Sequence, residues 1–184
     1  MKKWGFIGLE IIGGLAALFY LFVATIIGWF LFSMTPLYQK HFSFKPAGAA
    51  YVLKWGGMKG AAQVAKVLHA EASARSFTGD HLDLSVFQMK HFSEEKALAN
   101  GLWHRGPLQN EIQQKAVQFM LMMAGHEGEM GSHKPVFPTK AEFASKPFLF
   151  CFPWVVVGSH SVYGAIILIY DPETQKLYVF DGKT

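Results

Sequence analysis

The sequence predicts an α+β protein in which a single N-terminal transmembrane helix precedes a helical segment and a C-terminal antiparallel β-sheet. Three observations lead to this fold class. An apolar run of roughly thirty residues, from Trp4 to Met34, contains one charged side chain, Glu10. Helix-start signals and helical spacing of apolar residues then dominate the middle of the chain. From Pro147 onward, short apolar runs alternate with turn residues, which is typical of strands.

The apolar run is long enough for a membrane anchor. At about 1.5 Å per residue, a helix over this run exceeds the roughly 30 Å of a bilayer core, so it can cross with some tilt. A cleaved signal peptide is the alternative, because Lys2 and Lys3 give a basic start, but its apolar region is only about 7–15 residues long. Trp4 and Trp29 lie near the two ends, as in interfacial aromatic belts. We therefore expect an uncleaved single-pass anchor over residues 1–34.

The anchor also predicts an orientation and a partner. Basic residues are denser before the run than after it, which favours an N-terminus inside and an extracytoplasmic domain from about Thr35. Glu10 is an ionisable group within the apolar run. If it faces Gly13 and Gly14, these three residues mark a docking face for another membrane helix. If Glu10 instead reaches the headgroups or is protonated, it has no such role.

Beyond the anchor we expect a juxtamembrane linker over residues 35–50 and an α+β globular domain over residues 51–184. The formal net charge of +4 comes without a Lys/Arg run or a basic-aromatic stripe, so no nucleic-acid partner is predicted. The single cysteine, Cys151, cannot form an intramolecular disulfide and leaves the redox compartment open.

The first half of the domain gives three local signals. Ala, Leu and His side chains at helical spacing predict a helix over about Lys59–Arg75. Alternation of apolar and polar residues over 82–87 then predicts a strand. Ser93, followed by two acidic residues, predicts a short helix that ends near Trp103.

The second half gives two helices and a sheet. Pro107 stands where a first helical residue would stand, and an amphipathic pattern continues from it until Gly125. Thr139 and Glu142 have the spacing of a capping box for one short helix. Strands follow over residues 148–157, 162–170 and 177–180, and the polar stretch between the last two predicts a hairpin turn.

The hairpin carries a resemblance to a known family. The segment Gly164–Thr174, closing in Tyr178–Asp181, resembles the terminal strand pair of papain-like cysteine peptidases of the YopT type. In that family the first strand begins with the catalytic His, and the second ends in a Phe-Asp whose Asp orients this His. The nucleophilic Cys opens a helix after a glycine-rich turn, a context that Trp55–Ala61 resembles.

The residues that would carry the chemistry of this family are not matched. Asp181 aligns with the family's Asp, but the His position falls on Gly164 and the Cys position on Met58 or Lys59. A thiolate and an imidazole within hydrogen-bond reach are needed to activate the nucleophile. The resemblance therefore implies a degenerate relative.

Cys151, His160 and Asp181 form the other conceivable catalytic set. Cys151 lies between two phenylalanines in an apolar strand, where a free cysteine behaves as a small hydrophobe. We therefore predict no catalytic residues and keep this set as the alternative.

His126, Glu129 and His133 form the densest group of potential metal ligands. Glycines interrupt this stretch, and it has none of the spacings of known zinc sites. The sequence predicts a solvated polar loop here, with no metal and no cofactor.

These observations predict a single-pass membrane-anchored, non-enzymatic protein-interaction module, such as an envelope assembly factor, an immunity or exclusion protein, or a subunit of a membrane complex. Its expected partners are the lipid bilayer and another membrane or envelope protein. The alternative is a membrane-anchored papain-like hydrolase, degenerate in its catalytic residues. Because no nucleophile is paired with a base, the sequence favours the first function.

Overall fold

The chain divides into two compact units, Met1–Ser43 and Phe44–Thr184. The computed structural model describes residues 3–33, 47–73, 79–125, 137–159 and 161–184. The described residues of the first unit form the helix α1 (Lys3–Ser33), of 31 residues, so the predicted helix over the apolar run is confirmed. Its large apolar side chains that the structure describes, from Leu15 to Leu31, are 50–73% exposed. Within the described residues, no helix combines the length and the apolarity needed to cross a membrane.

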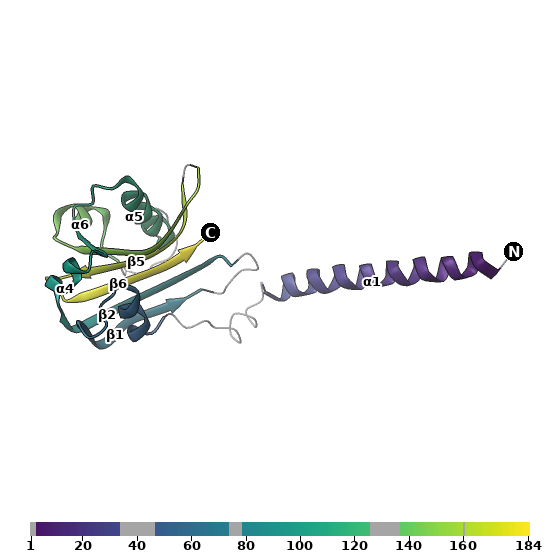
Figure 1. Ribbon diagram of the computed structural model, residues 1–184, viewed down its shortest axis with the longest axis horizontal. Coiled ribbons are helices and arrows are strands. Elements are labelled where there is room, and N and C mark those ends of the chain that lie inside the picture. The colour runs from purple at the N-terminus through teal and green to yellow at the C-terminus, as the bar shows by residue number, and fades with distance from the viewer. Residues whose placement is uncertain (1–2, 34–46, 74–78, 126–136, 160) are drawn as a thin grey trace. The chain divides into compact units, whose positions relative to one another are not determined.

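The second unit is built on a six-stranded antiparallel sheet, seen from its side in Figure 1. In spatial order the strands are β1 (Ala62–Ala72), β2 (His81–Phe92), β6 (Lys176–Lys183), β5 (Val162–Asp171), β4 (Leu149–Val157) and β3 (Trp103–Arg105). The strand that comes last in the chain, β6, therefore lies between β2 and β5. The predicted α+β class is confirmed, and so are the three C-terminal strands. The predicted order of helices before sheet is wrong, because β1 and β2 precede most of the helices.

Helices cover both faces of the sheet. On one face, Ile167 and Ile169 of β5 pack in a core with α5 (Glu111–Met123) and α6 (Lys140–Ser145), and Figure 1 shows these two helices together on that side. On the other face, Leu168 and Tyr170 pack in a second core with residues of α3 (Ala49–Trp55) and Ala97 of α4 (Glu94–Ala99). Successive residues of a strand point to opposite faces, so the continuous apolar run of β5 serves both cores.

Gly56, which follows α3, lies against the core on the α3 face. Its carbonyl oxygen accepts hydrogen bonds from Trp103 Nε1 at 2.7 Å and from Asn100 Nδ2 at 3.2 Å. A Cβ at Gly56 would lie 2.8 Å from Trp103 Cζ2 and 3.0 Å from Leu168 Cδ1, so this close approach requires glycine. The segment from α3 to Gly56 is thus fixed against the sheet. Residues 49 and 50 of the predicted linker belong to α3.

The helix predicted over Lys59–Arg75 is wrong, because this segment forms β1 instead. β1 pairs with β2 along its length, with register shifts at three places between Gln63 and His69. Two of these shifts leave an extra residue in β1, Ala65 and Leu68, and at each of them the alternation of its side chains slips by one residue. Strict alternation is thereby lost, and the pattern of the sequence no longer identifies a strand.

The amphipathic helix predicted after Pro107 is confirmed as α5, but its start is wrong. The Asn110 side-chain oxygen accepts hydrogen bonds from the backbone N–H groups of Ile112 and Gln113, at 2.9 and 3.2 Å, and so caps the helix. Gly125 follows the end of α5 with φ of 79°, as predicted for the residue that ends it.

The other two predicted caps are confirmed. Ser93 Oγ accepts a hydrogen bond from the Lys96 backbone N–H and begins α4, which ends at Ala99, earlier than predicted. Thr139 Oγ1 accepts from the Glu142 backbone N–H at 3.3 Å, while Glu142 Oε2 accepts from the Thr139 backbone N–H at 2.8 Å. This reciprocal capping box begins α6.

Candidate functional sites

Cys151 is placed where its thiol is inert. It lies in β4, opposite Trp103 on one side and Leu168 on the other, and is 1% exposed. Burial raises the pKa of the Cys151 thiol to about 12, so it is protonated at neutral pH. Because the thiolate is the nucleophilic form, this position does not support nucleophilic chemistry.

The structure does not bring Cys151 and Asp181 together. Cys151 is in register with Leu168 of β5, and Leu168 is in register with Val179 of β6. The two strands that carry Cys151 and Asp181 are thus separated by β5, or two spacings of about 4.8 Å each. His160, the third member of the predicted set, lies outside the described residues.

The positions implied by the peptidase resemblance hold no catalytic pair. Gly164 is opposite Lys183, and Asp181 is opposite Ile166. Met58 is fully buried in the core on the α3 face, and Lys59 is exposed in the turn before β1. Gly164 and Met58 supply neither an imidazole nor a thiol where the family would need them.

Asp181 is instead paired with His81, which the sequence analysis did not single out. His81 Nε2 lies 2.8 Å from Asp181 Oδ1, and His81 Nδ1 lies 2.8 Å from the Gly79 carbonyl oxygen. Both partners are acceptors, so both hydrogen bonds form together only when the imidazole carries a proton on each nitrogen. The two side chains are 14% and 19% exposed.

The residues around the His81–Asp181 pair indicate how it stabilises the sheet. Asp83, which is 5% exposed, lies directly opposite Asp181 in the register of β2 and β6. Like charges in such cross-strand positions destabilise a sheet, and the hydrogen bond between His81 and Asp181 ties one of the two carboxylates to a side chain of β2. Both ring nitrogens of His81 are engaged with protein oxygens. The pair therefore holds the start of β2 against the end of β6, and nothing local in the sequence indicates it, because 100 residues separate the two.

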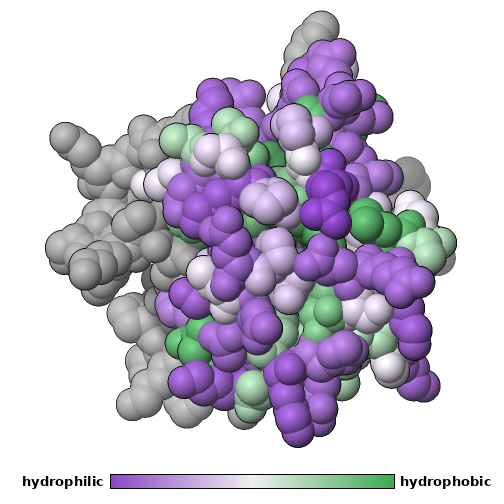
Figure 2. Space-filling model, turned by 90° about the vertical axis from the view of Figure 1, so that its left-hand side faces the viewer, coloured by the Kyte–Doolittle hydropathy of each residue, from purple (hydrophilic) through white to green (hydrophobic). Residues whose placement is uncertain are grey.

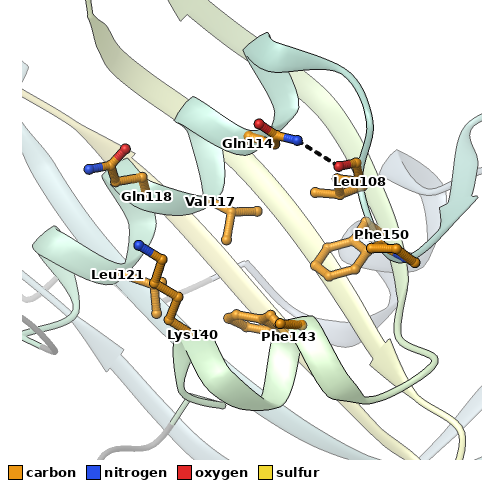
Figure 3. Close-up of a pocket in the computed structure, with 10 residues that line it drawn as sticks. Leu108, Gln114, Val117, Gln118, Leu121, Lys140, Phe143 and Phe150 are labelled. Carbon is orange, nitrogen blue, oxygen red and sulfur yellow. Dashed lines mark hydrogen bonds between the residues drawn. The ribbon is translucent and has the colours of Figure 1, made fainter.

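A pocket of about 390 Å³ opens between α5, α6 and β4 (Figure 3). This volume lies in the range of small-molecule sites, roughly 300–1,000 Å³. Its apolar lining includes Leu108, Val117, Leu121, Phe143 and Phe150.

The polar lining of the pocket comes from Gln114, Gln118 and Lys140. Gln114 Nε2 donates a hydrogen bond to the Leu108 carbonyl oxygen at 2.7 Å, which ties the segment before α5 to the helix. The sequence analysis missed this pocket, because its lining comes from three elements that only the fold brings together.

The outer edge of the sheet at β1 is a third candidate site. β1 is the terminal strand of the sheet, and its exposed apolar side chains include Val67 at 55% and Leu68 at 41%. At the other end, β3 pairs only with residues 149–151 of β4, and Val157 beyond them is 45% exposed. Figure 2 shows the molecule from the side where α4 and α6 lie in Figure 1, and hydrophilic residues cover most of that face.

The remaining predicted residues are placed as follows. His126, Glu129 and His133 lie outside the described residues, and no group of metal-ligating side chains occurs in the part of the chain that the structure describes. Glu10 and Gly13 lie in α1. At Gly14, an added Cβ would meet no atom within 4 Å, so the helix surface is open there.

Comparison with known proteins adds no family to this description. No family model, no curated protein and no solved structure matches the chain. The fold and the sites define the class: an α+β protein with a six-stranded antiparallel sheet and an N-terminal helix that forms a separate unit.

Proposed function

We propose that this protein is a single-pass membrane-anchored, non-enzymatic module that binds another membrane or envelope protein through the outer edge of β1. The single observation that carries the proposal is this edge. It offers an eleven-residue strand at the end of a sheet, with Val67 and Leu68 exposed.

A terminal strand presents backbone N–H and C=O groups to any extended segment that can add to the sheet. Such addition supplies affinity through backbone hydrogen bonds, and pockets or exposed side chains along the strand supply specificity. β1 is well suited because it carries few charges: Lys66 and Glu71, the latter 3.4 Å from His69. Proteins usually protect such edges from pairing with other chains by means of charges and bulges. β1 has bulges but few charges.

In this proposal the membrane anchor is the apolar run that forms α1. Over Trp4–Met34 it carries one charged side chain, Glu10, and its described apolar side chains are exposed to the surroundings of the helix. Exposed apolar surface on this scale marks a membrane or a protein partner. The basic N-terminal residues favour the orientation in which the second unit is extracytoplasmic.

The absence of an activated nucleophile at the predicted positions supports a non-enzymatic role. Burial raises the pKa of the Cys151 thiol to about 12, and Asp181 is hydrogen-bonded to His81. The alternative, a degenerate papain-like hydrolase, would need His160 and Asp181 to act together. Single substitutions of these two residues, each checked for thermal stability because Asp181 also holds β2 against β6, separate the functions: a hydrolase would lose activity in variants whose stability is unchanged.

Binding of a partner at the outer edge of β1 is tested by site-specific photocrosslinking in native membranes. A photoreactive residue at position 68 should crosslink to a defined partner, and the same residue at position 157, on the opposite side of the sheet, is the matched control. In the chain with the photoreactive residue at position 68, Val67→Lys should abolish the crosslink, whereas Val157→Lys should not. Equal crosslinking from positions 68 and 157, or an undiminished crosslink from position 68 in the Val67→Lys variant, would contradict the proposal.

The anchor is tested separately. A reporter that is active only outside the cytoplasm, fused after Thr184, should be active. Activity only from a cytoplasm-dependent reporter would reverse the orientation. If Glu10, Gly13 and Gly14 form a face for another helix, Glu10→Ala with Gly14→Leu should weaken copurification in mild detergent, because leucine prevents close backbone approach. Unchanged copurification would assign no partner to this face.

A further inference from the structure

The pocket between α5, α6 and β4 extends along α5 and is called the trough below. Its α5 lining spans Gln114 to Leu121, eight residues or two turns, which corresponds to about 10 Å along the helix. Val117 and Leu121 face into it from α5, and Phe143 comes from α6. A trough of this kind suits an extended apolar chain better than a compact ring system.

The two ends of the trough differ in charge. Figure 3 shows Lys140 beside Leu121 at one end, and Leu108 with Phe150 at the other. Lys140 is the sole charged side chain among the described lining residues, and no carboxylate lines the trough there. The carboxamide of Gln118 lies at the same end as Lys140, so it can donate a second hydrogen bond to an anionic group.

We propose that this trough binds a monoanionic amphiphile with an unbranched acyl chain, in the form of a free fatty carboxylate. The carboxylate lies at Lys140 and Gln118, and the chain follows Val117 and Phe143 toward Phe150. The apolar lining buries the chain, while the single cation selects the ionised headgroup over an uncharged one.

The ion pairs of the described residues leave Lys140 available for this role. Other lysines of this region are engaged in ion pairs: Lys115 with Glu111 at 2.7 Å, and Lys146 with Glu142 at 3.6 Å and Glu173 at 3.7 Å. Among the described residues, Lys140 has no such partner. Since Lys146 follows α6 but does not line the trough, it provides a matched control for the loss of a positive charge.

The test uses the full chain in zwitterionic phosphatidylcholine nanodiscs, with ¹³C-labelled methyl groups followed by NMR. Decanoate should shift the methyl signals of Val117 and Leu121 saturably, and decanol, which has the same chain without the charge, should bind about five- to tenfold more weakly. Methyl groups of the core on the α3 face, such as those of Leu168, should remain unshifted and report an intact fold.

Variants then test separately the role of Lys140 in binding the carboxylate and the role of the trough in binding the acyl chain. Lys140→Ala should weaken decanoate binding about five- to tenfold and leave decanol unchanged, while Lys146→Ala should affect neither. Ala144→Trp, at an exposed lining position, should fill the trough and abolish the shifts for both compounds. The proposal is overturned if decanoate produces no saturable shift, if Lys140→Ala binds it as the natural chain does, or if Ala144→Trp still binds it.

Discussion

Leu168→Ala is expected to be among the most destabilising single truncations in the sheet. Leu168 lies in β5, is 1% exposed, and is flanked in the register by Cys151 and Val179. On the side of α3, its Cδ1 closes the space in front of Gly56. The side chain is therefore enclosed by neighbours that the backbone holds in place.

The size of the effect follows from this enclosure. Replacing Leu168 by alanine removes three carbon atoms, at about 0.8 kcal/mol each in transfer free energy, or about 2.4 kcal/mol. Collapse of the surroundings is limited by the paired strands on both sides, so a cavity term adds to this. We expect a loss of about 3–4 kcal/mol in the free energy of unfolding. Ile166→Ala, on the same face but only partly buried, should lose about 1–2 kcal/mol.

The measurement is urea unfolding of the full chain in mild detergent, followed by tryptophan fluorescence, because Trp103 belongs to the same core. A fall in the midpoint at constant slope reports a change in stability alone. If Leu168→Ala cost less than 1 kcal/mol, or no more than Ile166→Ala, then β5 would not be packed between two cores as described.

Three further predictions concern stability and reactivity. Cys151 should resist a soluble maleimide in the native protein, because burial raises its thiol pKa to about 12, and should react in urea; fast native labelling would contradict its placement. Thr139→Ala should cost about 1 kcal/mol in urea unfolding. Hydrogen bonds from the Thr139 backbone N–H and side chain hold the pKa of the Glu142 carboxyl below its ordinary value of 4.5, so the contribution of this carboxylate is complete above this pH and is lost as the pH falls below it. A cost of Thr139→Ala close to zero at neutral pH would argue against the capping box. His81→Leu should lower the thermal midpoint, because the hydrogen bond between His81 of β2 and Asp181 of β6 is lost, and Asp181→Asn should restore part of the loss in the double variant, because it removes one of two facing carboxylates.

Local chemistry accounts for the elements that the sequence predicted correctly. Ser93 and Thr139 mark helix starts because their side chains satisfy backbone N–H groups within three residues. The apolar runs of β4, β5 and β6 are recognisable because both faces of a central strand are buried. At the start of α5, Asn110 and Pro107 are both plausible signals, and only the observed hydrogen bonds to Ile112 and Gln113 distinguish them.

Features that depend on distant pairing could not be predicted. β1 is a strand because β2 pairs with it, and its bulges remove the alternation that would have identified it. The contact of His81 with Asp181 depends on the register of β2 with β6, and the trough depends on α5 and α6 lying over β4. In each case the deciding neighbour is remote in the chain.

The central place of β6 has a consequence for how the protein is made. A ribosome delivers β1 and β2 first and then β3, β4 and β5, whereas Lys176–Lys183, the strand that joins these two groups, emerges after all of them. Until then β2 and β5 each expose an unpaired inner edge, and neither core has the residues of β6 that complete it. Closure of the sheet therefore waits until Lys176–Lys183 has been synthesised, and until then the inner edges of β2 and β5 are open to pairing with the wrong strands.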